Sequence, residues 1–314
     1  MSTLICGSLA FDTITTFDGR FAEHILPDKV HILNISFLVP TMRREFGGCA
    51  GNIAYSLALL GGNPLILAAL GEDGQSYLDR LNALRIPRTH VRQLLGSYTA
   101  QAHIITDRDN NQITSFHPGA MGRAHELPVP LDAGVTLAII APDGRAAMID
   151  HAAQLAAAGI PFVFDPGQGM PMFDGTDLRD FIAKASWVAV NDYEAELLVE
   201  RTGWSLDHIA TQVQGLVVTR GELGCRIWSD GAAPVDIPGV PARTVCDPTG
   251  CGDAFRAGLL YGLSHGWTLA DCTRLGNVLG SEKIAVHGPQ NHHLTLDSAL
   301  RRVAEVYGTA PQAA

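Results

Sequence analysis

Hydrophobic residues along the chain gather in short runs that glycine, proline and polar residues interrupt. The runs at 64–70, 135–141 and 187–191 are almost wholly apolar, which is typical of strands buried on both faces. Segments of helical length, such as 146–158, follow several of these runs. This alternation predicts βαβ units and a mostly parallel sheet that binds ligands at the carboxyl ends of its strands.

The expected strands of the main body cover residues 4–9, 64–70, 135–141, 161–165, 187–191 and 215–219. The expected helices cover residues 53–60, 76–84, 146–158, 178–185, 194–202, 206–213, 254–264, 269–286 and 296–307. The predicted fold class is therefore α/β, with a mostly parallel central sheet between two layers of helices.

Two stretches, 13–46 and 99–118, instead alternate polar and apolar residues, as strands with one covered face do. Within the second, residues 102–106 and 112–116 flank a polar turn and predict a hairpin. We expect both stretches to form a small antiparallel β lid that projects from the main body. The main domain would then comprise residues 1–12, 47–98 and 119–314.

Composition narrows the function classes. With 46% hydrophobic residues the chain can bury a large core, and its net charge of −10 argues against a nucleic-acid partner. No apolar run of about 18 residues is present, so we expect no membrane partner. The six cysteines form no C-x-x-C pair, and the first residues do not resemble a signal peptide. We therefore expect reduced thiols and a cytoplasmic location.

The segment 247–258 holds the clearest chemical signal. Gly250 and Gly252 lie in a tight turn, and the apolar run that follows predicts a helix. Unpaired amides and the helix dipole at such a start favour an anion. Asp253 lies beside them, where a carboxylate can take a proton from a hydroxyl group. The pattern indicates phosphoryl transfer, although an acid in a first helical turn is also common without any catalytic role.

Four motifs resemble those of the ribokinase (phosphofructokinase B) family of sugar and nucleoside kinases. They are 47–54 (GGCAGNIA), 191–194 (NDYE), 219–224 (TRGELG) and 247–258 (DPTGCGDAFRAG). Less specific segments, among them 19–21, 36–39, 115–121 and 202–205, are most similar to bacterial ribokinase-like adenosine kinases. The resemblance spans nearly the whole chain and implies the ribokinase-like three-layer fold.

By this resemblance Asp253 is the catalytic base, and the main-chain amides of Gly250, Cys251 and Gly252 bind the transferred phosphate. The family usually has a small residue such as alanine at position 251, so the cysteine departs from its pattern. A thiol at this place could make the site sensitive to alkylation. The alternative interpretation of the glycines is a tight turn needed only for packing.

The resemblance also implies ATP and Mg²⁺ as cofactors and leaves open a monovalent cation such as K⁺. Asn191 and Glu194 would hold Mg²⁺ indirectly, through water, and Asn191 would also contact ATP. The alternative for this pair is a helix N-cap with a capping-box acid. The remaining residues expected to line ATP are Thr219, Gly221, Gly224, Thr249 and Gly252.

For the acceptor, Asp12 and Asn52 have the hydrogen-bonding groups that the 2′ and 3′ hydroxyls of a ribose need. Gly47 and Gly48 would let the main chain approach the sugar. The other expected substrate residues are Ser8, Ser36, Phe116 and Gln168. Two alternatives stay open, Asp12 as a turn former and Phe116 as lid core.

The sequence thus predicts an ATP-dependent kinase that phosphorylates the 5′-hydroxyl of adenosine to give AMP, as a homodimer joined through the lid. Where some relatives have an aromatic residue in the hairpin, this chain has the segment 101–103 (QAH), which weakens the preference for adenine. A kinase for ribose, fructose or another nucleoside is the nearest alternative, and a ligand-binding regulator the more distant one. His287, His292 and His293 are interpreted as surface or nucleotide-rim residues.

Overall fold

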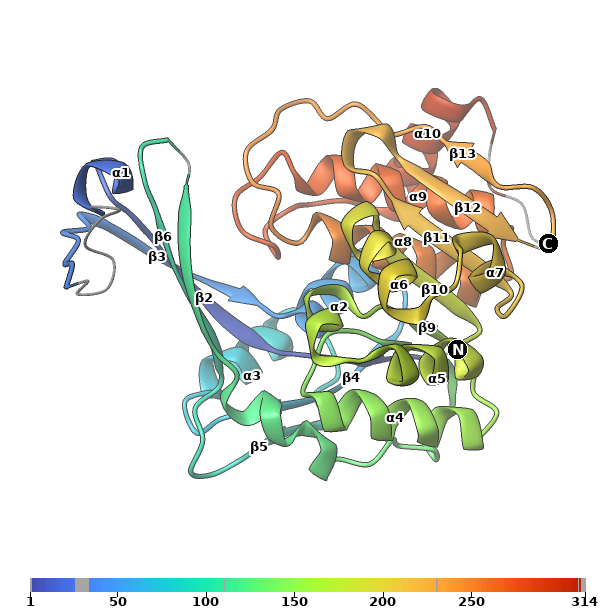
Figure 1. The fold of residues 1–314 in the computed structure, drawn as a ribbon, viewed down its shortest axis with the longest axis horizontal. Helices are drawn as coiled ribbons and strands as arrows, with labels where there is room; N and C mark the ends of the chain where they lie inside the picture. The colour runs from blue at the N-terminus through green and yellow to red at the C-terminus, as the bar shows by residue number, and fades with distance from the viewer. Residues whose placement is uncertain (1, 26–33, 110, 230, 310, 312–314) are drawn as a thin grey trace.

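The computed structural model describes residues 2–25, 34–109, 111–229, 231–309 and 311, and Figure 1 shows a main body with a narrow projecting arm. The main body contains a nine-stranded sheet in the order β13-β12-β11-β10-β9-β8-β1-β4-β5. All neighbours from β11 to β5 pair in parallel, and β12 runs antiparallel to both β11 and β13. The strands are β1 Ser2–Cys6, β4 Pro64–Leu70, β5 Val91–Gln93, β8 Val135–Ile140, β9 Phe162–Phe164, β10 Trp187–Asn191, β11 Gly215–Thr219, β12 Cys225–Ser229 and β13 Val235–Ile237.

Helices cover both faces of this sheet, as expected from its apolar strands. Along β1, Ile5 packs into one core cluster, while Leu4 and Cys6 pack into the other, because successive side chains of a strand point to opposite faces. One cluster is covered by α2 Cys49–Leu59, α3 Gln75–Ala83, α8 Cys251–Ser264, α9 Leu269–Lys283 and α10 Leu296–Tyr307. The other is covered by α4 Arg145–Ala157, α5 Gly175–Lys184, α6 Asp192–Thr202 and α7 Leu206–Ala210.

The projecting arm is a four-stranded sheet in the order β3-β2-β6-β7. Its strands are β2 Ala10–Thr16, β3 Thr41–Gly47, β6 Ala100–Thr106 and β7 Gln112–His117, and the short helix α1 Phe21–His24 follows β2. The β6–β7 hairpin is antiparallel, as is the β2–β3 pair, whereas β2 and β6 pair in parallel. Part of the expected alternating stretch, 26–33, lies outside the described residues.

Most expected elements of the main body are present, and the strands 64–70, 187–191 and 215–219 and the helix 296–307 have the predicted bounds. Helices α2 and α8 begin earlier than expected, since glycine and cysteine in their first turns were assigned to loops. The lid sheet also begins earlier, at Ala10, and thereby includes Asp12. Strands β5, β12 and β13 were not predicted. None of the described helices is both long and apolar enough for a membrane span.

Candidate active site

The loop before α8 has the geometry of an anion-binding turn. Gly250 is the N-cap residue and has a φ of 81°, a left-handed conformation that favours glycine. The Oδ1 atom of Asp247 accepts a hydrogen bond of 2.9 Å from the Thr249 amide. The Cys251 amide donates to the Pro248 carbonyl at 3.1 Å, so it is not free to bind a phosphate as predicted. The amides of Gly252 and Asp253, which start the helix, have no carbonyl one turn earlier within it.

Asp253, in the first turn of α8, is half-buried and contacts the start of α2. The Nδ2 atom of Asn52 donates a hydrogen bond of 2.8 Å to its Oδ2 atom. Burial raises the pKa of Asp253 to about 6, while hydrogen bonds from Asn52 and the Cys49 thiol oppose the rise. A carboxylate with such a pKa is ionised at neutral pH and still basic enough to accept a proton.

A chain of hydrogen bonds fixes the orientation of the Asn52 amide. The Tyr77 hydroxyl donates to the Gly47 carbonyl, which can only accept, over 2.6 Å. The Nε2 atom of Gln290 donates to the Tyr77 oxygen at 2.8 Å and to Oδ1 of Asn52 at 3.1 Å. Because this order leaves Nδ2 of Asn52 on the side of Asp253, the Gly47 carbonyl determines the polarity of the whole chain.

Asp12 lies on β2, opposite Glu45 of β3. A Cβ atom at position 47 would come within 2.3 Å of the Asp12 carboxylate, so Gly47 makes room for that side chain. Burial raises the pKa of Asp12 to about 6, and the negative charges of Glu45 and Asp247 add to the rise. The Cys49 thiol lies within electrostatic range of Asp253, Asp165 and Asp12, which places these carboxylates around the start of α2.

The other predicted substrate residues differ in their surroundings. The Ser8 hydroxyl accepts a bond of 3.2 Å from the Cys49 amide, so it caps α2 instead of lying free. Gly48, with a φ of 85°, packs closely against the Ser8 carbonyl. Ser36 and Gln168 are exposed. Phe116 is also exposed, which excludes a lid-core role within this chain.

A buried ion pair connects α8 to the main sheet. The Nε atom of Arg256 donates to Oδ2 of Asp165 at 3.1 Å, and its Nη2 atom donates to Oδ1 at the same distance. Nη2 also donates to the Ala189 carbonyl at 3.3 Å. The guanidinium lies within electrostatic range of both Asp253 and Glu194. One buried cation therefore lies among the acids of the predicted catalytic and metal sites.

Asn191 and Glu194 form a capping box at the start of α6, so the alternative interpretation of this pair is geometrically correct. The Oδ1 atom of Asn191 accepts from the Glu194 amide at 2.8 Å, and Oε2 of Glu194 accepts from the Asn191 amide at 2.9 Å. Burial and the neighbouring charge of Asp165 raise the pKa of Glu194. The box does not need the Oε1 atom of Glu194.

Within the described ranges, no group of three or more His, Cys, Asp or Glu side chains could hold a metal ion by itself. Mg²⁺ is commonly held by one or two carboxylates, waters and the phosphates of a nucleotide. The buried Glu194 carboxylate, with one oxygen outside the capping box, has the donor chemistry for that arrangement. The residues present thus fit Mg²⁺ bound through water.

A free monovalent cation fits less well beside the loop. Carbonyl oxygens that converge next to a carboxylate would suit such an ion. The carbonyls of Asp247 and Val286 converge in this way, but both accept hydrogen bonds from the buried ammonium of Lys283, at 2.8 and 3.1 Å. The chain's own cation therefore occupies these oxygens.

The expected ATP-lining residues fall into two groups. Thr219 ends β11 and Gly221, with a φ of 55°, lies exposed in the turn after it. Gly224 is buried, and a Cβ there would come within 2.2 Å of the Ile237 carbonyl. Gly224 is thus explained by the close packing of β12 on β13, whereas Thr219 and Gly221 remain at an open strand end.

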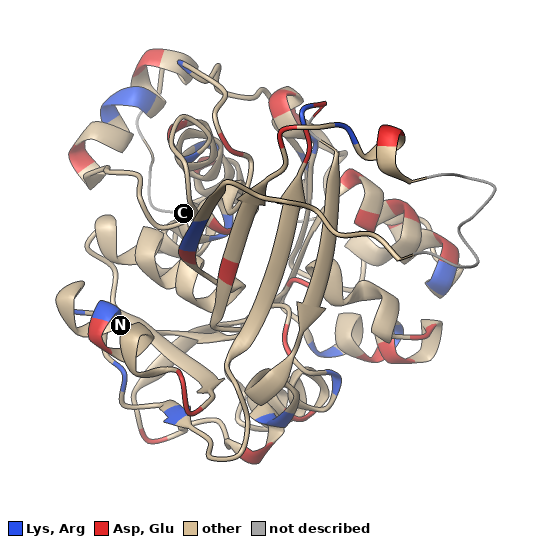
Figure 2. Ribbon diagram, turned by 90° about the vertical axis from the view of Figure 1, so that its left-hand side faces the viewer, with Lys and Arg blue, Asp and Glu red and all other residues tan. Residues whose placement is uncertain are grey.

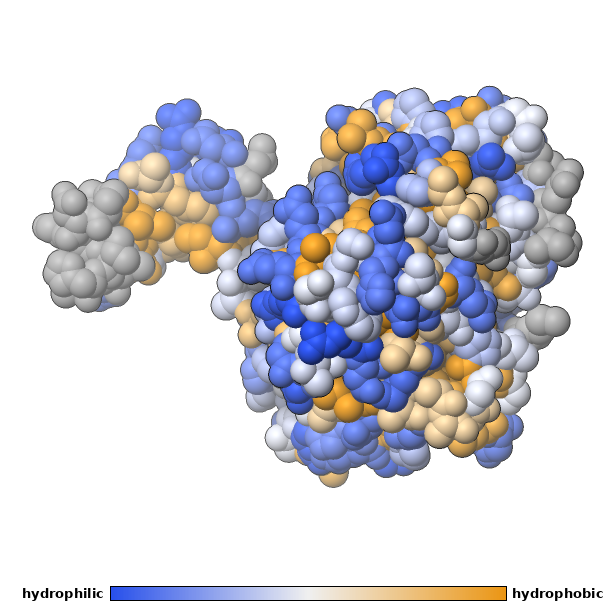
Figure 3. Space-filling view, turned by 45° about the vertical axis from the view of Figure 1, so that its right-hand side comes forward, coloured by the Kyte–Doolittle hydropathy of each residue, from blue (hydrophilic) through white to orange (hydrophobic). Residues whose placement is uncertain are grey.

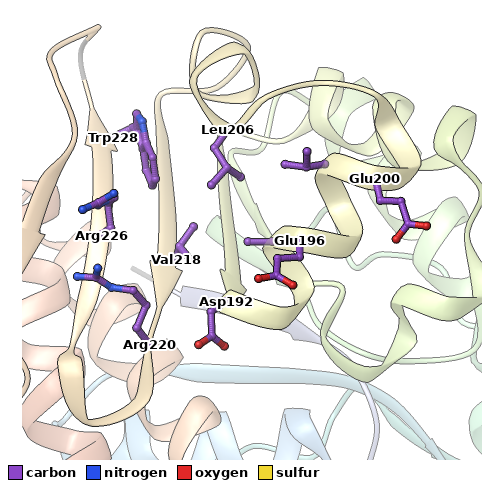
Figure 4. Close-up of a pocket in the computed structure, with 10 residues that line it drawn as sticks. Asp192, Glu196, Glu200, Leu206, Val218, Arg220, Arg226 and Trp228 are labelled. Carbon is purple, nitrogen blue, oxygen red and sulfur yellow. The ribbon is translucent and has the colours of Figure 1, made fainter.

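Figure 4 shows a separate cavity of about 460 Å³ between α6 and the strands β11 and β12. Glu196 and Glu200 lie on its helical side, and Arg220 and Arg226 lie across from them. Val218, from the apolar cluster on the face opposite α8, lines it too. None of the predicted site residues lines this cavity.

The expectation that His292 lies at the surface was wrong. His292 is buried against Tyr55, and burial lowers its pKa to about 4, so it is not a surface residue. Burial raises the pKa of the Cys251 thiol to about 11, so little of it is thiolate at neutral pH, and its sensitivity to alkylation stays a prediction. Arg256 and Lys283 were missed, because isolated polar residues in helical patterns usually face solvent. Gln290 was missed because it lies in a turn after α9, where no periodic pattern marks a buried residue.

Residues 23–295 match the profile described as pfkB family carbohydrate kinase. The chain is 30% identical over 291 residues to a nucleoside kinase of Methanocaldococcus jannaschii, covering 92% of this chain and 94% of that protein. A solved structure of Burkholderia thailandensis nucleoside kinase in complex with inosine is 53% identical, with a TM-score of 0.89 and 99% of each chain covered. The same Burkholderia enzyme in complex with ADP-inosine gives 54% identity, a TM-score of 0.86 and coverage of 99% and 98%.

Proposed function

Because the chain belongs to the pfkB family of carbohydrate kinases, we propose that it transfers the γ-phosphoryl group of ATP to the 5′-hydroxyl of a purine nucleoside. Adenosine would give AMP, and inosine is an acceptor of the same shape. The observation that carries the proposal is the Asp253 carboxylate in the first turn of α8, held by Asn52 over 2.8 Å. The inosine bound by the Burkholderia relative supports a purine nucleoside over a free sugar.

In the proposed reaction, Asp253 accepts the proton of the 5′-hydroxyl group while the oxygen of that hydroxyl group bonds to the γ-phosphorus. The bond from that phosphorus to the β,γ-bridging oxygen breaks, and ADP leaves. The amides of Gly252 and Asp253 and the positive end of α8 stabilise the charge on the transferred group. Mg²⁺, when bound with ATP, neutralises charge on the phosphates. Asn191 and Glu194 would hold its waters, and Thr219 and Gly221 would border the nucleotide.

Asp12 and Asn52 would bind the ribose hydroxyls. The Nδ2 atom of Asn52 donates one hydrogen bond to Asp253 and has a second hydrogen. Asn52 can therefore contact both the catalytic base, Asp253, and the acceptor nucleoside. Phe116, exposed on the lid strand β7, is available to cover the nucleoside base. Ser36 and Gln168 are exposed and would complete the base pocket only when the lid closes.

We also propose that the lid joins two subunits and that the protein works in the cytoplasm. Leu38 and Met42 are 87% and 73% exposed, and Ile113 and Phe116 are exposed on the same arm. Figure 3 shows apolar surface on this arm, and Figure 2 shows few charged residues on its strands. Such exposed apolar surface favours an interface. All six cysteines are free, as in a reducing compartment.

The test is a coupled assay of ADP release with adenosine, inosine, guanosine, cytidine, ribose and fructose as separate acceptors. We expect turnover with the purine nucleosides and at least about tenfold lower kcat/KM with either free sugar, since the base contacts would be lost. Efficient turnover of ribose with none of adenosine or inosine would make the protein a sugar kinase. Tight nucleoside binding with no ADP release would make it a regulator.

A further inference from the structure

Lys283 is a fully buried ammonium beside the loop that starts α8. It is one of three lysines in the chain and ends helix α9. Its side chain is 0% exposed. Lysine is almost never buried so completely unless it is paired, because removing an ammonium from water costs several kcal/mol. We therefore expect the Lys283 ammonium to have specific hydrogen-bond partners.

The Nζ atom has two main-chain partners from different parts of the chain. Its bond to the Val286 carbonyl, at 3.1 Å, is the contact that many lysines make at a helix end. Its bond to the Asp247 carbonyl, at 2.8 Å, joins the helix to the phosphate-binding loop 36 residues earlier. Helix capping explains the first bond and leaves the second without an explanation.

Asp247 connects Lys283 to the loop before α8 and to the lid. Its carboxylate accepts from the amides of Thr249 and Gly288, both at 2.9 Å, and lies 3.5 Å from Nη2 of Arg43 on lid strand β3. Burial opposes ionisation of Asp247, but these amide bonds and the charge of Lys283 lower its pKa below the ordinary value. The loop that precedes the anion site is thus built around one carboxylate and one buried cation.

The charges that face Lys283 come from several elements. Asp247 attracts the ammonium, the thiols of Cys251 and Cys246 lie near it, and Arg43 repels it. Asp247 is thus the carboxylate that balances the ammonium, as it would balance a bound K⁺ ion. Lysine suits this place because its charge is compact and its donors can turn toward separate carbonyls.

We propose that Lys283 is a positioning residue that supplies, as part of the chain, the positive charge that a free monovalent cation would otherwise provide at this loop. This inference rests on the proposed kinase function and deepens it. Lys283 holds the Asp247 carbonyl, so that Thr249, Gly250 and the first amides of α8 keep one conformation. Catalysis should then be independent of K⁺.

The experiment compares the unaltered protein, Lys283→Ala, Lys283→Met and the control Lys184→Ala. Lys184 is matched in type and lies at the end of α5, where it pairs with Asp180 on the surface. Activity with MgATP and inosine is measured in buffers whose only monovalent cation is K⁺, Na⁺, NH₄⁺ or tetramethylammonium. Circular dichroism checks that each variant is folded.

We expect the unaltered protein and the control to vary by less than about twofold across the cations, because no free ion is needed. Lys283→Ala should lose about tenfold or more of kcat/KM in tetramethylammonium, as removal of a charged hydrogen bond predicts, and recover much of it in K⁺ or NH₄⁺. Lys283→Met, whose stem fills the space, should recover less. A role in packing alone would give a loss that no cation restores.

Two results would overturn the inference: a strong requirement of the unaltered protein for K⁺, or a loss in Lys283→Ala that K⁺ and NH₄⁺ do not reverse. If both variants unfold, the cation dependence of the unaltered protein decides alone. Calorimetric ADP binding in the same buffers does not depend on the acceptor. The ADP affinity of the unaltered protein should be nearly the same with every cation, and that of Lys283→Ala should be restored by K⁺ or NH₄⁺. If ADP binding follows this pattern but no nucleoside is phosphorylated, the acceptor assignment fails and the role of Lys283 stands.

Discussion

The Nδ2 atom of Asn52 lies 2.8 Å from the Oδ2 atom of Asp253, although 201 residues separate them in the chain. The bond joins the first turns of α2 and α8, the two helices that follow the glycine motifs. It stabilises the ionised carboxylate and opposes the rise in pKa that burial causes. The carboxylate that would accept the proton and the amide that would bind the acceptor are thus joined by a direct hydrogen bond.

Replacement of Asp253 by Asn should remove the base and leave the shape of the site. We expect kcat to fall by about 10²–10⁴-fold, the usual contribution of general-base catalysis. Binding of ADP and nucleoside, measured by calorimetry, should change by less than about threefold, since the carboxylate acts mainly in the transition state. Normal turnover by Asp253→Asn would refute its assignment as the base.

Replacement of Gln290 by Leu tests the hydrogen-bond chain from Gly47 to Asp253. Without the Nε2 donor the Asn52 amide can rotate, and Asp253 loses a partner that lowers its pKa. We expect about a tenfold lower kcat and an acid limb displaced to higher pH, because a bond to a charged group is worth about 1.5–3 kcal/mol. Gln93→Leu, on the remote strand β5, is the control. An unchanged pH profile would mean that Gln290 does not position Asn52.

The pH dependence of kcat/KM should show an acid limb near pH 6. Burial raises the pKa of both Asp253 and Asp12 to about 6, and both act in ionised form in the proposed reaction. Activity should therefore be full above this pH and fall by about tenfold or more per pH unit below it. Rates from about pH 5 to 8 in constant ionic strength measure the limb, and a profile flat down to about pH 5 would contradict the assignment.

The buried carboxyl group of Asp143 should make the stability of the folded protein depend on pH. It is 1% exposed, and burial raises its pKa to about 8 from 3.8. Among the described residues its Oδ2 atom has no partner, while Oδ1 accepts from the Gly144 amide at 2.8 Å. The folded state keeps a proton that the unfolded state has lost between those pKa values, so stability falls as pH rises through this window.

The neutral substitution Asp143→Asn should remove that penalty. Its advantage in the free energy of unfolding should grow by about 2–4 kcal/mol between about pH 5 and pH 8. Urea unfolding at each pH measures the difference from the unaltered protein. An advantage that stays constant across this range would mean that Asp143 is ionised in the folded protein.

The Arg256–Asp165 pair should behave as a buried salt bridge. Arg256→Met or Asp165→Asn alone should each cost about 3–5 kcal/mol, because each leaves the other charge buried without its partner. The double variant should cost less than the sum of the two. Denaturant unfolding of all four proteins measures the coupling energy, and strictly additive effects would contradict the ion pair.

Much of the fold could be predicted because its signals are local. The apolar strand 187–191 and the helix 296–307, which begins at a threonine capping box and ends before a glycine, have their predicted bounds. Strands β12 and β13 were missed because they are short and lie among turn residues. They become strands only by pairing with β11 and with each other, which no local pattern specifies.

The residues of the candidate site also divide into those that a local pattern predicts and those that depend on distant partners. Asp253 and Gly250 were predictable because a glycine turn before a helix has a local physical meaning. Arg256 and Lys283 were not, since their burial depends on Asp165 and Asp247, which lie 91 and 36 residues away. The Asn191–Glu194 pair shows a further limit, because one spacing serves both a capping box and a metal-binding role.

The most direct test of the central claim is identification of the products that the unaltered protein and Asp253→Asn form from MgATP with adenosine or inosine. Chromatography and phosphorus NMR would identify and quantify each product. The proposal predicts one nucleoside 5′-monophosphate for every ADP with the unaltered protein and almost none with the variant. Release of ADP without a nucleoside monophosphate, or equal product from both proteins, would contradict it.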